Sequence, residues 1–164
     1  MEKTTEVLLV SISKQRMYHQ YQDGTVKTYV ISTSLNAPSC RENSLGTPWG
    51  LHQVCDVIGI DQPKGMTFTA RKPTGLCYWE YSFPESEKNL ITSRILRLEG
   101  LEAGVNKGEG IDTLERFVYV HGTNHEDRLG RPASSGCIQL SNEDMIELSQ
   151  TGLTGSHLYI SLTN

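Results

Sequence analysis

The chain has 164 residues and a mass of 18.3 kDa, a size typical of one domain with a single hydrophobic core. Fifteen Lys and Arg residues against nineteen Asp and Glu residues give a net charge of −4 and a pI near 5.7, which argues against a general attraction to nucleic acid or to an anionic membrane. We therefore expect one domain over residues 1–164, with no nucleic acid and no membrane as partner.

The start of the chain carries no recognisable export signal. The apolar run from Val7 to Val10 is too short for a secretory signal or a spanning helix. The sequence therefore predicts a cytoplasmic protein that is complete from Met1, with an exported location expected only if a leader has been trimmed.

Four cysteines, at positions 40, 55, 77 and 137, form neither a C-x-x-C pair nor a dense disulfide framework. Free thiols are the expected state in a domain of this size. Cys55 and Cys77 are predicted to be small buried hydrophobic side chains.

The first part of the chain predicts a β-meander. β-branched residues dominate residues 6–13, and apolar and polar side chains alternate over residues 15–21. Asp23-Gly24 is a turn dipeptide typical of a hairpin and leads into a third predicted strand at residues 26–32.

The middle of the chain alternates loops with strands. Residues 33–48 form a long loop without periodicity, for which we expect a function. Residues 51–58 predict a strand, whereas residues 61–75, with two prolines and two glycines, predict a loop. Residues 90–98 fit a helix or a strand, and we interpret them as a strand. Residues 117–121 predict a strand that ends in a histidine.

The last segment predicts one short helix and a closing strand. Ser141, followed three residues later by Asp144, resembles a capping box, and Gly152 would end the helix. Residues 158–162 predict the closing strand. The fold class is therefore mainly β, with one short helix in the C-terminal half.

The densest group of reactive residues lies between His121 and Asp144. A histidine at a strand end is followed, after a glycine-containing loop, by Cys137 with Gly136 before it. An imidazole is the natural activator of a cysteine, because a free thiol is mostly protonated at neutral pH. Gly136 would allow a sharp turn whose backbone N–H groups meet an oxyanion. From the residues alone, a buried cysteine and a hydrogen-bonded histidine are an equal alternative.

The order of these motifs resembles the YkuD-type L,D-transpeptidase family. The catalytic stretch of that family is a strand ending in His-Gly, a loop, and Ser-His-Gly-Cys followed by Ile or Val and then Arg or Asn. The corresponding segments here are His121-Gly122-Thr123, Leu129-Gly130-Arg131-Pro132, Ser134-Ser135-Gly136-Cys137-Ile138-Gln139 and Asn142-Glu143-Asp144. Upstream, the resemblance reaches residues 13–18, 23–24, 46–50 and 94–100, so it covers nearly the whole chain. It implies a β-sandwich-like YkuD fold.

The resemblance implies a role for each catalytic position. Cys137 would be the nucleophile, His121 its general base, and the backbone carbonyl of Gly122 would hold the imidazole tautomer, while the backbone at Gly136 would serve the oxyanion. Cys137 would attack the bond between a diamino acid and the terminal D-Ala of a peptidoglycan tetrapeptide stem and form a thioester. The resemblance also implies binding of carbapenem-type inhibitors, and no cofactor is expected.

Two positions depart from the family pattern. Ser135 stands where the family has a second histidine, so His121 is expected to act alone. Gln139 replaces the usual Arg or Asn by a neutral amide, so substrate preference is expected to differ. Arg128 and Arg131 are candidates for the missing positive charge, although exposed arginines are often only solvated.

Further residues are candidates for binding a substrate or a metal. Ser134 and Ser135, beside the nucleophile, and Trp49, in a turn, are further substrate-binding candidates, although a turn aromatic commonly packs on the edge of a core. His121 and His125 have the spacing of a zinc pair on a helix. Gly122 and the β-branched run before it predict a strand end instead, so no metal site is expected.

The sequence leaves the acceptor of the acyl group open. Water would make the protein an L,D-carboxypeptidase, and an amine of a second stem would make it an L,D-transpeptidase. The expected cytoplasmic location favours a carboxypeptidase that acts on muropeptides in peptidoglycan recycling. A non-catalytic muropeptide-binding module is a further alternative, because Ser135 and Gln139 depart from the motif.

Overall fold

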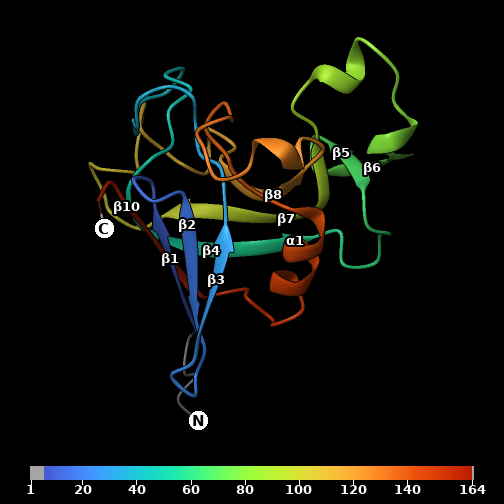
Figure 1. The fold of residues 1–164 in the computed structure, drawn as a ribbon. Helices are drawn as coiled ribbons and strands as arrows, with labels where there is room; N and C mark the ends of the chain where they lie inside the picture. Colours follow the sequence, from blue (N-terminus) through green and yellow to red (C-terminus); the bar gives the residue numbers. More distant parts are fainter. Residues whose placement is uncertain (1–5, 164) are drawn as a thin grey trace.

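The computed structural model describes residues 6–163, which form a mainly β structure with one α-helix, as the sequence predicts (Figure 1). The strands form one hydrogen-bonded sheet in the order β3-β2-β1-β10-β4-β7-β5-β6, and β8 pairs with β7 and carries β9. The strands are β1 (Val7–Ser11), β2 (Arg16–Gln20), β3 (Val26–Val30), β4 (Gly50–Ile58), β5 (Met66–Thr69), β6 (Lys72–Cys77), β7 (Ile91–Gly100), β8 (Tyr119–Thr123), β9 (Ile138–Leu140) and β10 (His157–Ser161).

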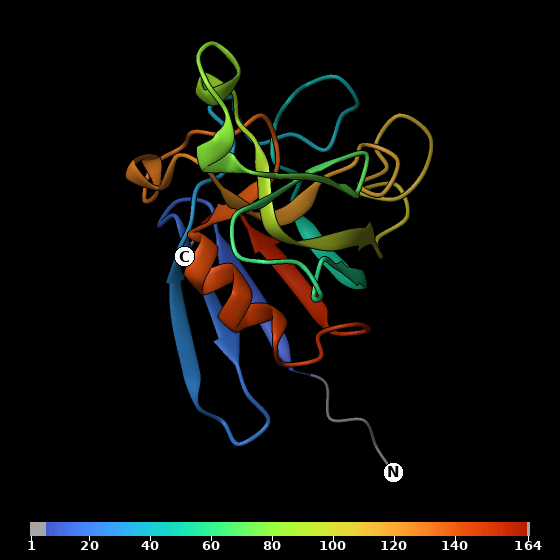
Figure 2. The same cartoon turned by 90° about the vertical axis from the view of Figure 1, so that its right-hand side faces the viewer.

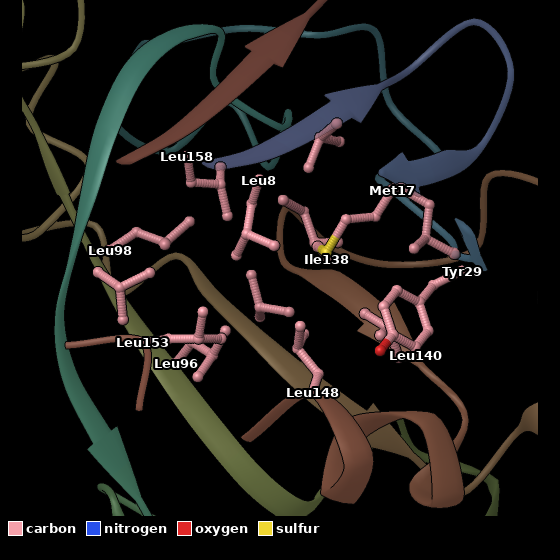
Figure 3. Close-up of a cluster of buried hydrophobic side chains, with 14 of the residues drawn as sticks. Leu8, Met17, Tyr29, Leu96, Leu98, Ile138, Leu140, Leu148, Leu153 and Leu158 are labelled. Carbon is pink, nitrogen blue, oxygen red and sulfur yellow. The ribbon is translucent and has the colours of Figure 1, made fainter. Parts of the chain in front are cut away.

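The sheet curls around one main core, which gives the sandwich-like arrangement that we expected. Leu8 from β1 and Met17 from β2 lie in the same apolar cluster as Leu96 from β7 and Ile138 from β9 (Figure 3). Side chains alternate between the two faces of a strand, so every second side chain of the first predicted strands points to this core. Strand β8 carries His121, and β9 begins directly after Cys137. Both strands are therefore held in place, because one face of each packs on this core.

The α-helix α1 (Asn142–Ser149) closes the open side of the curled sheet (Figure 2). The Oγ of Ser141 accepts a hydrogen bond from the Asp144 N–H at 3.1 Å, so the predicted cap is present. Met145 and Leu148 on α1 are fully buried in the main core.

Two parts of the structure differ from the sequence expectation. Residues 61–75, which we expected to be a loop, contain β5 and most of β6, joined by a turn in which Ala70 and Arg71 have φ of 48° and 65°. Strand β8 begins at Tyr119 rather than at Phe117, because Phe117 has a φ of 57° and ends a turn.

The chain between β6 and β7 projects from the body of the molecule (Figure 1) and contains the short 3₁₀ turns η1 (Tyr78–Glu80) and η2 (Glu85–Glu87). A third, η3 (Glu126–Arg128), follows β8. All four cysteines are free thiols; Cys77 is buried as expected, whereas Cys55 is half-buried. Within residues 6–163 no helix is both long enough and apolar enough to span a membrane.

Candidate active site

His121 lies in β8, and Cys137 directly precedes β9, the parallel neighbour of β8. In the register of β8 and β9, His121 lies opposite Gln139, and Ile138 lies opposite Val120. Val120 and Ile138 face the main core, so the side chains that alternate with them face the other way. On that second face Cys137 packs against the apolar cluster that contains Ile95 and Tyr119. The fold thus brings the predicted base and nucleophile to one face of the sheet.

The imidazole of His121 is held in one tautomer by its neighbour in the chain. Its Nδ1 lies 2.6 Å from the carbonyl oxygen of Gly122. A carbonyl only accepts, so Nδ1 carries the proton and Nε2 keeps its lone pair. Burial lowers the pKa of His121 to about 4, and the bond to Gly122 opposes this shift only in part. His121 is therefore a neutral base at neutral pH.

Gly122 has no room for a side chain. A Cβ at this position would lie 2.7 Å from the carbonyl oxygen of Thr92 and 3.0 Å from Oδ1 of Asn142. Glycine is therefore required here by the close approach of β7 and α1, and the carbonyl that orients His121 is fixed by that packing.

Cys137 is half-buried, and its sulfur interacts with the strand that carries the histidine. The Tyr119 N–H donates to Sγ at 3.3 Å, and the thiol lies 3.7 Å from the carbonyl oxygen of Phe117. Burial raises the pKa of Cys137 to about 11, opposed by the Tyr119 N–H and by the charge of Arg116. The resting pair is thus a neutral thiol and a neutral imidazole.

Among the described residues, no hydrogen bond joins Cys137 to His121. The thiol instead occupies the position beside Phe117 and Tyr119. His121 can accept the proton of Cys137 only when the two groups come within hydrogen-bond reach, and catalytic hydrogen bonds are often long or absent in unliganded sites.

A cavity of about 300 Å³ opens beside the nucleophile, so the thiol is accessible from solvent. His121 does not line this cavity. The lining residues combine the nucleophile segment, the turn before β8 and the loop of residues 33–48: Glu42, Asn43, Leu45, Glu115, Arg116, Phe117, Val118, Ser135, Gly136 and Cys137.

The turn before Cys137 is built by Ser134 and Gly136. Gly136 has a φ of 127°, a conformation that disfavours any other residue. The Ser134 hydroxyl donates to the Cys137 carbonyl at 2.6 Å and accepts from the Gly136 N–H at 3.2 Å. The Gly136 N–H, which the sequence assigned to the oxyanion, is therefore already engaged. The Cys137 N–H has no partner within residues 6–163 and is the freer donor.

Of three other predicted binding residues, one lines this cavity and two do not. Ser135 is exposed and lines it. Gln139 is 3% exposed, lies opposite His121 in the register, and its backbone pairs with Ser32 on the other side. Trp49 lines a separate cavity of about 370 Å³.

Neither arginine that we proposed for the missing positive charge lines the cavity of Cys137. Arg128 lies in η3, where its carbonyl accepts from the Ser32 hydroxyl at 3.1 Å, and Arg131 is exposed. The cation on the cavity wall is Arg116, which sequence reasoning did not single out. Nothing in its sequence context distinguishes it from other surface arginines.

His125 does not form a metal site with His121. Its Nε2 lies 3.0 Å from the carbonyl oxygens of Glu87 and Lys88. In the described part of the chain, no three His, Cys, Asp or Glu side chains gather in a group that could hold a metal ion.

Solved structures with the same fold are L,D-transpeptidases. The enzyme from Mycobacterium smegmatis aligns with 96% of this chain and 58% of its own length, at 16% identity and a TM-score of 0.57. L,D-transpeptidase 3 from Mycobacterium tuberculosis, solved with a faropenem-derived adduct, aligns with 96% of this chain and 60% of its own length, at 15% identity and a TM-score of 0.59. This chain is thus clearly shorter than both, and the likeness concerns the fold.

Two sequence comparisons agree with this likeness. YqjB of Bacillus subtilis (strain 168), which is named as a candidate L,D-transpeptidase, is 37% identical over 49 residues, or 30% of this chain and 28% of that protein. The family model described as YkuD, L,D-transpeptidase catalytic domain, matches residues 5–160, which is nearly all of the sequence. The chain therefore belongs to the YkuD family of L,D-transpeptidase catalytic domains.

Proposed function

We propose that the protein cleaves the L,D bond between the diamino acid and the terminal D-Ala of peptidoglycan tetrapeptide stems, through a thioester on Cys137, and that water resolves the thioester. Membership of the YkuD family supports the bond and the substrate class. The single observation that carries the mechanism is the His121 Nδ1 to Gly122 carbonyl bond of 2.6 Å, because it leaves Nε2 as a base on the face that holds Cys137.

The chemical steps balance as ordinary acyl transfer. The sulfur of Cys137 bonds to the carbonyl carbon while its proton passes to Nε2 of His121, and the Cys137 N–H stabilises the oxyanion. The C–N bond then breaks, and the proton passes to the amine of the leaving D-Ala. Water, deprotonated by His121, attacks the thioester, and the tripeptide leaves with a free carboxylate as the thiol is restored.

Water is the proposed acceptor because hydrolysis needs only the thioester and solvent. Cys137 can carry the thioester, and the cavity that it lines lets water reach it. Cross-linking would also need a bound amine from a second stem. The proposed substrates are therefore muropeptides, and the proposed setting is their recycling in the cytoplasm.

The test is mass spectrometry of products from a defined disaccharide tetrapeptide. We expect the tripeptide and free D-Ala from the wild type and neither product from Cys137→Ala, with Cys55→Ala as a matched thiol control. Dimers without tripeptide would instead identify a transpeptidase. No product, together with Cys137 labelling as slow as that of the other cysteines, would point to a binding module.

A further inference from the structure

Arg116 stands on the wall of the cavity that Cys137 lines. The other charged residues of that wall are the carboxylates Glu42 and Glu115. Arg116 is therefore the cation of this wall, in a site where the neutral Gln139 occupies the family position for Arg or Asn.

The guanidinium of Arg116 is locked in place by the loop of residues 33–48. It donates to the carbonyl oxygens of Ser39 at 3.0 Å and Gly46 at 2.7 Å, and to the hydroxyl of Ser44 at 3.3 Å. A planar fork held by three acceptors cannot swing into solvent as a flexible lysine would. Its charge is therefore fixed relative to the cavity.

The same contacts bring this charge close to the nucleophile. The Gly46 carbonyl that accepts from Arg116 also lies 3.5 Å from the position of a Cβ at Gly136, the residue before Cys137. On the other side, the thiol of Cys137 lies 3.7 Å from the carbonyl of Phe117, the residue that follows Arg116. The loop that holds the guanidinium and the residue after Arg116 thus both lie against the nucleophile segment.

We propose that Arg116 is a positioning residue that stabilises the thiolate of Cys137 through its fixed positive charge. The inference rests on Cys137 being the nucleophile of the proposed function. It is tested on the thiol itself, without any stem peptide.

The surroundings of Cys137 explain why this charge matters. Burial is the largest influence on the thiol and raises its pKa, while the Tyr119 N–H and Arg116 lower it. Of the other ionisable groups, His121 is neutral, and Arg71 donates to the Tyr119 hydroxyl at 3.0 Å. Glu42 and Glu115 on the cavity wall would oppose the thiolate. Burial lowers the pKa of Arg116, but an arginine stays charged throughout the neutral range.

The experiment measures the rate of alkylation of Cys137 by the neutral reagent iodoacetamide as a function of pH, with labelling at each cysteine resolved by peptide mass spectrometry. Below the thiol pKa the rate follows the thiolate fraction, so every tenfold fall in rate corresponds to a rise of about one unit in the pKa of Cys137. We expect alkylation to be several-fold slower in Arg116→Gln, roughly as for a loss of up to one pKa unit of stabilisation, and the gap to narrow as the pH approaches the thiol pKa. Arg116→Lys keeps the charge without the fixed fork and should show a smaller fall.

The lysine variant separates charge from architecture, since it loses the three-acceptor fork but keeps the cation. Arg41→Gln is the matched control, because Arg41 is exposed on the same loop and does not line the cavity. Equal slowing in the lysine and glutamine variants, or a gap that stays the same even when the pH passes the thiol pKa, would overturn the proposal. If Arg116→Gln does not fold, Arg116→Met takes its place. If the alkylation rates are as expected here but the wild type does not cleave the stem peptide, the proposed function is contradicted and this inference is not.

Discussion

The hydroxyl of Thr47 donates a hydrogen bond to the carbonyl oxygen of Gly136 at 2.9 Å, which ties the loop of residues 33–48 to the residue before the nucleophile. The same hydroxyl accepts from the Ser34 N–H at 3.0 Å. Thr47 is 1% exposed, so both bonds are shielded from water. The long loop for which the sequence suggested a function is thus a support for the turn that carries Cys137.

Replacing Thr47 by valine keeps its shape but removes both bonds. Two buried backbone groups, the Gly136 carbonyl and the Ser34 N–H, would then be unpaired, each at a cost of about 1 to 3 kcal/mol. We expect a loss of roughly 2 to 6 kcal/mol in the free energy of unfolding in urea, and slower alkylation of Cys137. Thr25→Val removes an exposed hydroxyl bond in the β2–β3 turn and should change stability by less than about 0.5 kcal/mol. An equal effect of both variants would contradict the support role.

Arg71 reaches the active-site strand from the β5–β6 turn. Its guanidinium donates to the Tyr119 hydroxyl at 3.0 Å and lies 5.4 Å from the centre of the Phe117 ring. The backbones of these two aromatic residues hold the sulfur of Cys137. A double-mutant cycle of Arg71→Gln and Tyr119→Phe should therefore give a coupling of about 1 kcal/mol in unfolding free energy. Additive effects within about 0.3 kcal/mol would show that the two side chains do not interact.

Asn142, the first residue of α1, connects the helix to β7 and to the end of β8, the strand that carries His121. Its Oδ1 accepts from the Ser93 hydroxyl at 2.6 Å, and its Nδ2 donates to the Thr123 carbonyl at 2.8 Å and to Oε1 of Glu126 at 2.7 Å. Asn142→Ala would leave these buried groups unpaired beside Gly122. We expect a loss of about 3 kcal/mol in unfolding free energy. Asn36→Ala, at an exposed amide, is the control, and a loss as small as at Asn36 would show that the Asn142 bonds add little.

Much of this architecture is determined by short stretches of the sequence. The alternating side chains of β2, the Asp23-Gly24 turn and the cap at Ser141 each act within a few residues, so their structures could be predicted. The motif also predicts that His121 and Cys137 act together; the structure puts both on one face of the sheet, and their joint action stays a prediction.

Features that depend on distant packing could not be predicted in this way. The β5–β6 turn uses Ala70 and Arg71 at positive φ, without the glycine or asparagine that normally indicates such a turn. Arg116 becomes part of the site only because Phe117 turns the chain before β8 and because the loop of residues 33–48 supplies its acceptors. Neither contact has a short-range signal.

Two buried histidines make the fold sensitive to acid. Burial lowers the pKa of both His121 and His52 from 6.5 to about 4. His52 is held between the carbonyl of Gly50 at 3.0 Å and the hydroxyl of Thr113 at 2.9 Å. Between pH 6.5 and pH 4 the unfolded chain therefore binds protons that the folded chain does not, so stability rises with pH in this window and falls as the solution is acidified.

We expect the unfolding free energy to fall by about 1.4 kcal/mol per pH unit for each of these histidines as the pH drops through that window. Urea unfolding of His121→Gln and His52→Gln at a series of pH values measures this, because glutamine does not titrate there. Each variant should reduce the slope, whatever its effect on stability at neutral pH, while Asn36→Ala, which removes no titratable group, should keep the wild-type slope. A wild-type slope in His121→Gln would mean that the pKa of His121 is not lowered in the folded protein, which would contradict the burial of its ring as the cause of the acid sensitivity.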